Sequence, residues 1–315
     1  MSTPQVPGRQ RLPATAGGTN LDDFGTAEWL LLAAVAAMWG SSFLFMAIGL
    51  ESLRPGVVTL ARISLGAAAL AVVPRARRAV DREDLPRIAL LGVIWMGIPL
   101  TLFPVAQQWI DSSVAGILNA GMPLTTAAWA TVLLRRVPGR RALLGLALGF
   151  VGIVAVFLPE LAESRANALG SALVVGAVFL YGLAANVAVP LQQRYGALPV
   201  LWRAQLAALV VVLPFGLYSL PGSSFAWGPV LAMLPLGVLG TGLAFALMAT
   251  LVGRVGGPRG TVAIYFVPLV AIGLGLAVRG EAIAPSALVG TALVLAGAWL
   301  ASRGERTAPE AAPPA

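Results

Sequence analysis

The 315-residue sequence contains no cysteine and no histidine, and all 21 of its basic residues are arginines. Without thiols and imidazoles the chain lacks disulfides, thiol chemistry, imidazole-based metal sites and the most common general base of enzymes. Charged residues are also scarce, at 11% of the chain against about 25% in soluble domains. We therefore predict no metal, no cofactor and no soluble enzyme domain.

Apolar residues, in contrast, make up 58% of the chain. They gather in ten runs of about 18–24 residues, each long enough to cross a hydrocarbon core of roughly 30 Å. The runs cover residues 27–49, 55–73, 86–107, 112–134, 141–158, 168–190, 198–218, 227–250, 258–278 and 284–302. We predict an all-α integral membrane protein with ten transmembrane helices in a lipid bilayer, and disordered cytoplasmic tails at 1–26 and 303–315.

The arginines indicate how these helices are oriented. If the N-terminus lies in the cytoplasm and the spans alternate, only three arginines fall outside: Arg54, Arg165 and Arg279. Sixteen fall inside: Arg9, Arg11, Arg75, Arg77, Arg78, Arg82, Arg87, Arg135, Arg136, Arg140, Arg141, Arg194, Arg254, Arg259, Arg303 and Arg306. This positive-inside bias predicts a multi-pass protein of the plasma or inner membrane with both termini cytoplasmic. It also accounts for the isoelectric point near 11.3 without nucleic acid as a partner.

The chain repeats itself after a shift of 145 residues. Gly97 falls on Gly242, Pro123 on Pro268, Gly145 on Gly290, and Gly152 on Gly297. Matches at glycine and proline carry weight because backbone geometry selects these residues. Each copy holds an odd number of spans, so we predict two inverted five-helix repeats, 27–158 and 168–302. Such repeats are typical of carriers that work by alternating access around a midplane site.

Several motifs resemble those of the drug/metabolite transporter superfamily, in its EamA-type branch. The motifs are Trp39-Gly40-Ser41-Ser42-Phe43, Arg62, the Pro-Leu pairs at Pro123 and Pro268, and Arg279-Gly280-Glu281. The resemblance implies a ten-helix bundle that exports small metabolites or drugs, with a central cavity between its halves. One departure concerns the end of the fourth span, where the family often has Gly-Glu and this chain has Arg135-Arg136. A role for the family's glutamate therefore remains only at Glu281.

Polar and aromatic residues near mid-span are the candidates for lining a solute cavity. They are Trp39, Ser42, Asn119, Tyr181, Asn186, Gln205 and Tyr265. The alternative is that such side chains join helices, at about 0.6 kcal/mol per hydrogen bond. No acidic residue lies inside a span, which argues against a buried proton switch and an intramembrane metalloenzyme or protease. We therefore expect transport to follow the solute gradient.

Three charged residues allow two interpretations each. Arg62 lies within the second span, so it either contacts an anion or forms a hydrogen-bonding hub between helices, and the sequence favours the hub. Arg203 lies near an inside end, so it either contacts an anion or simply extends its side chain toward the interface. Glu281 precedes Pro285, which favours capping of free N–H groups at the start of the last span over solute contact.

Three functions remain open from the sequence. The first is export of a small organic solute by alternating access, and the second is uniport of a metabolite down its gradient. The third is a non-transporting membrane protein, such as a lipid-handling enzyme or a scaffold. An enzyme would need clustered nucleophiles, acids or bases, and the sequence shows none, so we predict that the protein is not an enzyme. A homodimer is compatible with the sequence.

Overall fold

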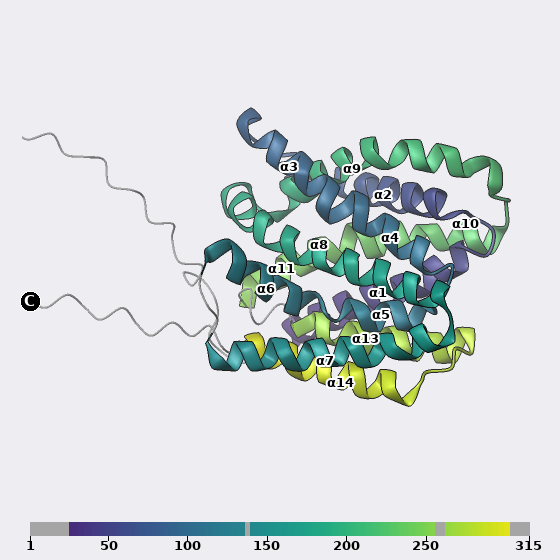
Figure 1. Ribbon diagram of the computed structural model, residues 1–315. Helices are drawn as coiled ribbons and strands as arrows, with labels where there is room; N and C mark the ends of the chain where they lie inside the picture. Colours follow the sequence, from purple (N-terminus) through teal and green to yellow (C-terminus); the bar gives the residue numbers. More distant parts are fainter. Residues whose placement is uncertain (1–24, 136–138, 256–261, 303–315) are drawn as a thin grey trace, which may run out of the picture.

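The computed structural model describes residues 25–135, 139–255 and 262–302, and all regular structure within these ranges is helical (Figure 1). The predicted all-α class is therefore confirmed. The predicted tails fall outside the described residues, apart from residues 25 and 26.

The helices follow the ten apolar runs. The first half holds α1 (Thr26–Gly49), α2 (Pro55–Ala71), α3 (Leu85–Leu91), η3 (Gly92–Gly97), α4 (Ile98–Ala106), α5 (Ser112–Asn119), α6 (Met122–Leu134) and α7 (Arg140–Glu163). The short 3₁₀ turns η1 (Pro74–Arg77) and η2 (Arg82–Asp84) join α2 to α3. The second half holds α8 (Arg165–Tyr195), α9 (Ala197–Ser219), η4 (Leu220–Gly222), α10 (Trp227–Leu234), η5 (Pro235–Leu243), α11 (Ala244–Val255), α13 (Val262–Leu274), η6 (Gly275–Arg279) and α14 (Pro285–Ser302).

In the described part of the chain, seven helical stretches are long and apolar enough to cross a membrane. The helices α2 and α14 are apolar but shorter, and the fourth run is divided into α5 and α6. The division falls at Ala120–Gly121, and Pro123 lies in the first turn of α6, where its missing N–H costs nothing. Its repeat partner Pro268 lies inside α13 instead. The number of ten crossings stays a prediction.

The first helix of each half packs mainly against helices of the other half. The first helix of the second half, α8, packs on α3, η3, α4, α5 and α6 of the first half. In the same way, α1 packs on α10, η5, α11 and α13 of the second half. We call α8 together with these partners the α8 bundle, and α1 together with its partners the α1 bundle. Two further pairs complete the fold, α2 with α9 and α7 with α14, and each pair consists of two equivalent helices. The packing is therefore approximately symmetric between the two halves.

The contacts between α7 and α14 give the relative direction of the copies. Gly145 approaches the backbone of Gly297 and Ala301, whereas Gly152 approaches that of Gly290. Residue numbers thus rise along α7 as they fall along α14, and the two helices are antiparallel (Figure 1). Because they are equivalent under the 145-residue shift, the repeats are inverted, as predicted. The same distances confirm that glycines on these helices serve close packing, since a Cβ there would overlap the opposite backbone.

We call the end of the bundle that carries Arg54, Arg165 and Arg279 the outer end, following the arginine count. The opposite end, with Arg87 and Arg194, is the inner end.

Candidate functional site

A π-helix in the second half organises the middle of the molecule. Along η5, the i→i+5 pattern of a π-helix replaces the usual ladder and leaves carbonyl groups available to side chains. Trp39 of α1 donates from Nε1 to the Gly240 carbonyl at 3.2 Å. Gln205 of α9 donates from Nε2 to the Thr241 carbonyl at 2.8 Å. Of these two neighbouring carbonyl groups, one thus accepts a bond from the first repeat and the other accepts a bond from the second.

Arg62 reaches the same π-helix from α2. It is buried, with 5% of its surface exposed, and its Nε donates to Thr241 Oγ1 at 3.2 Å. Its Nη1 lies 3.3 Å from Met46 Sδ. Among the described residues, no carboxylate lies within ion-pair distance of Arg62. The positive charge is therefore surrounded only by neutral groups, which is costly at mid-depth in a membrane.

The central cluster, as we call it, comprises Trp39, Ser42, Arg62, Gln205 and Thr241. Ser42 is buried against Gly240 and donates to the Met38 carbonyl at 2.8 Å. Gln205 is fully buried, and its Oε1 has no hydrogen-bond partner in the described structure. Four sequence-predicted residues thus meet at two consecutive positions of η5: Trp39 and Ser42 at Gly240, and Arg62 and Gln205 at Thr241. They come from α1, α2 and α9, and therefore from both repeats.

Two aromatic series border the central cluster. Phe245 lies edge-to-face between Trp39 and Trp95, at centroid distances of 5.2 and 5.7 Å. Phe103 lies between Phe43 and Tyr181, at 5.6 and 5.9 Å. Each series begins on α1 and ends on a helix of the α8 bundle, so both cross between the bundles.

Tyr181 packs against the hydrophobic core cluster that contains Met46, the partner of Arg62. This places a second sequence-predicted aromatic residue beside the central cluster.

Sequence reasoning missed Thr241, Phe245, Trp95 and Phe103. Aromatic residues in an apolar run resemble ordinary core, so the three rings gave no signal. Thr241 did carry one, because it is a polar residue between Gly240 and Gly242 in the middle of a span.

The remaining predicted residues lie elsewhere. Asn186 donates to the carbonyls of Thr126 and Gly182, at 3.0 and 2.9 Å, and so joins α8 to α6. Asn119 is half-buried at the end of α5, and Tyr265 packs against the small hydrophobic cluster that contains Leu124 and Val294. Arg203 extends toward the inner end, with its Nη1 3.2 Å from the Pro199 carbonyl.

Glu281 caps a helix, but of the other repeat. The sequence predicted a cap at the start of its own span; instead, the carboxylate accepts bonds from the first turn of α5. Ser112 N and Oγ donate to Oε1 at 3.1 and 2.6 Å, and Ser113 N donates to Oε2 at 2.9 Å. Burial alone would raise the pKa of Glu281, but these donors outweigh it and lower the pKa below its usual value. Nearby Asp111 has a raised pKa, owing to burial and then to the charges of Glu281 and Glu163.

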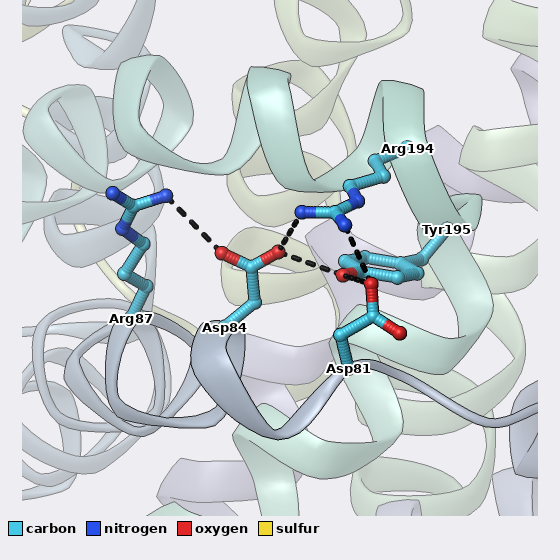
Figure 2. Close-up of polar contacts among 5 residues, drawn as sticks. All are labelled: Asp81, Asp84, Arg87, Arg194 and Tyr195. Atoms are coloured by element: carbon cyan, nitrogen blue, oxygen red, sulfur yellow. Dashed lines mark hydrogen bonds and ion pairs between the residues drawn. The ribbon is translucent and has the colours of Figure 1, made fainter.

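A charged cluster at the inner end joins the end of α8 to the turn before α3 (Figure 2). Asp84 is 3% exposed and receives bonds from Arg194 and Tyr195, both at 2.7 Å, and from Arg87 at 3.1 Å. Arg194 also contacts the exposed Asp81 at 2.5 Å. The cluster holds two elements of the α8 bundle together.

No group of three acidic side chains in the described ranges lies close enough to hold a metal ion. The central cluster contains no carboxylate and no nucleophile activated by a base. Its chemistry is that of recognition by hydrogen bonds, aromatic contact and one positive charge.

Comparisons with known proteins agree with this arrangement. The profile of the EamA-like transporter family matches residues 27–158 and 168–303. A "Probable terminal-alkyne amino-acid exporter" of Streptantibioticus cattleyicolor is 30% identical over 273 residues, covering 85% of this chain and 90% of the relative. The "Uncharacterized transporter YoaV" of Bacillus subtilis is 24% identical, covering 82% of this chain and 91% of its own.

A protein of known crystal structure has the same fold, with a TM-score of 0.61 over 87% of this chain and 97% of its own, at 17% identity. At that identity the likeness concerns the fold alone. The family profile spans both halves, and the 30%-identical relative covers most of the chain; this protein therefore belongs to the EamA-like transporter family.

Proposed function

We propose that this transporter exports a small organic solute from the cytoplasm by alternating access, and that the central cluster is where the solute binds. The observation that carries the proposal is the meeting of polar side chains from both repeats at η5, with a buried positive charge among them. A site shared by both halves can be opened to either side when the halves rock against each other. The name of the Streptantibioticus relative supports the outward direction.

The charge of Arg62 favours a solute that carries a carboxylate. Its partners Thr241 and Met46 are neutral, so an incoming carboxylate would be the first group to neutralise it. The rings of Trp39 and Tyr181 suit an apolar portion of the same solute. Amino acids with apolar side chains combine both features and match the solute class in the relative's name.

Efflux from proteoliposomes tests this proposal. Vesicles loaded with labelled apolar amino acids should release them faster with the protein than without it, and no imposed pH gradient should be needed. Trp39→Ala should slow release at near-normal yield, because it removes a contact of the central cluster. Trp227→Ala is the matched control, since Trp227 is 71% exposed at the start of α10 and should leave release unchanged.

Three results would contradict the proposal or part of it. If the folded protein releases none of the apolar amino acids, the solute class is wrong. Uphill movement driven by a pH gradient alone would contradict the energetics. Equal uptake and efflux under equal gradients would favour the uniporter over the exporter.

A further inference from the structure

Glu281 joins the two bundles at the outer end. It follows η6 and α13 in the second half, and α13 belongs to the α1 bundle, whereas Ser112 and Ser113 open α5 in the α8 bundle. Each oxygen of the carboxylate receives at least one bond from this helix start, where N–H groups lack partners within the helix. One side chain thus connects residues that are 169 positions apart in the sequence.

Helix packing extends this connection toward the middle of the molecule. Gly116 of α5 lies directly against Ala271 of α13, and its position also faces the ring of Phe43. Ala271 itself is 2% exposed. At the outer end the two bundles are therefore in contact from the cap down to the level of Gly116.

The inner end cannot form the equivalent bond, and the sequence alone shows why. The repeat shift places Arg136 opposite Glu281, and an arginine cannot accept hydrogen bonds. It also places Gly257 and Pro258 opposite Ser112 and Ser113, and proline has no N–H to donate. The α6 half of the fourth span, toward the inner end, packs on α7, α8 and α14.

We infer that Glu281 is a one-sided clamp that holds the outer end closed and must release α5 before solute can leave. This inference rests on the proposed alternating-access function. Because the residues equivalent to Glu281 and Ser113 in the other repeat cannot form this bond, the resting protein prefers the state that is closed outside. The clamp therefore makes the outer end differ from the inner end, although the fold itself is approximately symmetric.

The clamp is also sensitive to acid at the outer end. Asp111 lies near Glu281, and Asp111 itself is exposed to the negative charge of Glu163 and to the positive charge of Arg279, which bonds Glu51. The pKa of Glu281 is lowered in the closed form, so ionisation stabilises closure above the unperturbed pKa. That stability is lost as the pH falls through the closed-state pKa. A proton that binds and leaves at the same end is not transported, so transport driven by the solute gradient remains consistent with the clamp.

Labelling of a single cysteine tests the clamp without any solute, because the chain has no cysteine of its own. Ala271→Cys places a thiol beneath the cap, and its reaction with a bulky maleimide reports opening of the outer end. Glu281→Gln and Glu281→Ala in this background should react at least about tenfold faster, since hydrogen bonds to a charged group are lost. Glu51→Gln is the matched control, because it removes an acid at the same end that does not bond α5, and it should change the rate far less than either Glu281 variant.

A second arm uses pH. Labelling of Ala271→Cys, normalised to an exposed reference at Phe225→Cys, should rise with acid in the parent and stay constant with Glu281→Gln. Unchanged rates in both Glu281 variants of the folded protein would overturn the inference, as would a pH response that survives Glu281→Gln. Since no solute is present, a confirmed clamp together with absent efflux would contradict only the proposed function.

Discussion

Arg135 and Gly280 occupy equivalent positions in the two repeats, and both have a left-handed backbone, with φ of 51° and 65°. Each ends a helix, α6 and η6 respectively. Glycine adopts this conformation without strain, whereas a residue with a Cβ pays about 1 kcal/mol or more. Arg135 thus stands at a position whose geometry suits glycine, the residue that the family often has there.

Arg135→Gly should therefore raise the free energy of unfolding in detergent by about 1 kcal/mol, as measured by denaturant titration. Arg135→Ala is the control, because it removes the charge but keeps the Cβ. Equal stabilisation by both variants would mean that charge, and not backbone strain, is responsible.

Gly152→Ala should destabilise the protein by about 1–3 kcal/mol, since its new Cβ would meet the backbone of Gly290 and Val294 and push α14 away from α7. Gly176→Ala is the matched change in α8, where a Cβ meets nothing within 4 Å. It should be neutral or stabilise by up to about 1 kcal/mol, because alanine favours helix. Thermal unfolding followed by tryptophan fluorescence distinguishes them, and equal melting temperatures would refute the close-packing interpretation.

Arg62→Leu separates the two interpretations of this residue. The sequence favoured a packing hub, which predicts a loss of folded yield, whereas the neutral partners of Arg62 favour solute contact. Thr241 Oγ1 keeps its bond to the Leu236 carbonyl without Arg62, so no buried donor is left unpaired. We therefore expect near-normal yield and efflux reduced about ten- to a hundredfold for a carboxylate solute.

Thr241→Val is the companion variant, because it removes the hydroxyl that positions Arg62 but leaves the charge. It should slow efflux less than Arg62→Leu does. Low yield of Arg62→Leu with normal efflux per folded molecule would restore the packing hub.

Asp84→Asn should lower the melting temperature, because it removes the charge that binds Arg87 and Arg194 at the inner end. Asp81→Asn, in the same turn, should lower it less, since the Asp81 side chain is 60% exposed and that of Asp84 only 4%. The difference should shrink in high salt if screening weakens the cluster. An equal effect of both variants would show that burial of Asp84 contributes nothing.

Reporter fusions test the predicted topology. A C-terminal fusion after Ala301 should be active only with a cytosolic reporter, because the arginine count places both termini inside. A periplasmic signal at that position would contradict the ten-span arrangement.

The sequence predicted the helices well because apolar length is a local property. The run 27–49 differs from α1 by a single residue, and the run 112–134 begins and ends where α5 begins and α6 ends. The division between α5 and α6 was not predictable in the same way, since equivalent prolines, Pro123 and Pro268, lie at a helix start in one copy and inside a helix in the other. Whether a span is divided into two helices depends on its packing against neighbouring helices, which cannot be deduced from the sequence of the span itself.

The site was predictable in part, for a similar reason. Trp39, Arg62 and Gln205 could be selected from their depth and polarity. Their common partner Thr241 could not, because its role depends on the π-helix that presents it. The cap made by Glu281 was predicted in kind but on the wrong helix, since only the inverted packing brings α5 within its reach.

Two π-helices, η3 and η5, lie at equivalent positions of the two repeats, and this bears on the origin of the chain. Under the repeat shift, η3 falls on residues 237–242, entirely within η5. Each π-turn closes over one residue more than an α-turn does. Two independent insertions at the same point of two separate spans are a less economical history than one. A single five-helix ancestor that already carried the π-turn accounts for both copies with one insertion.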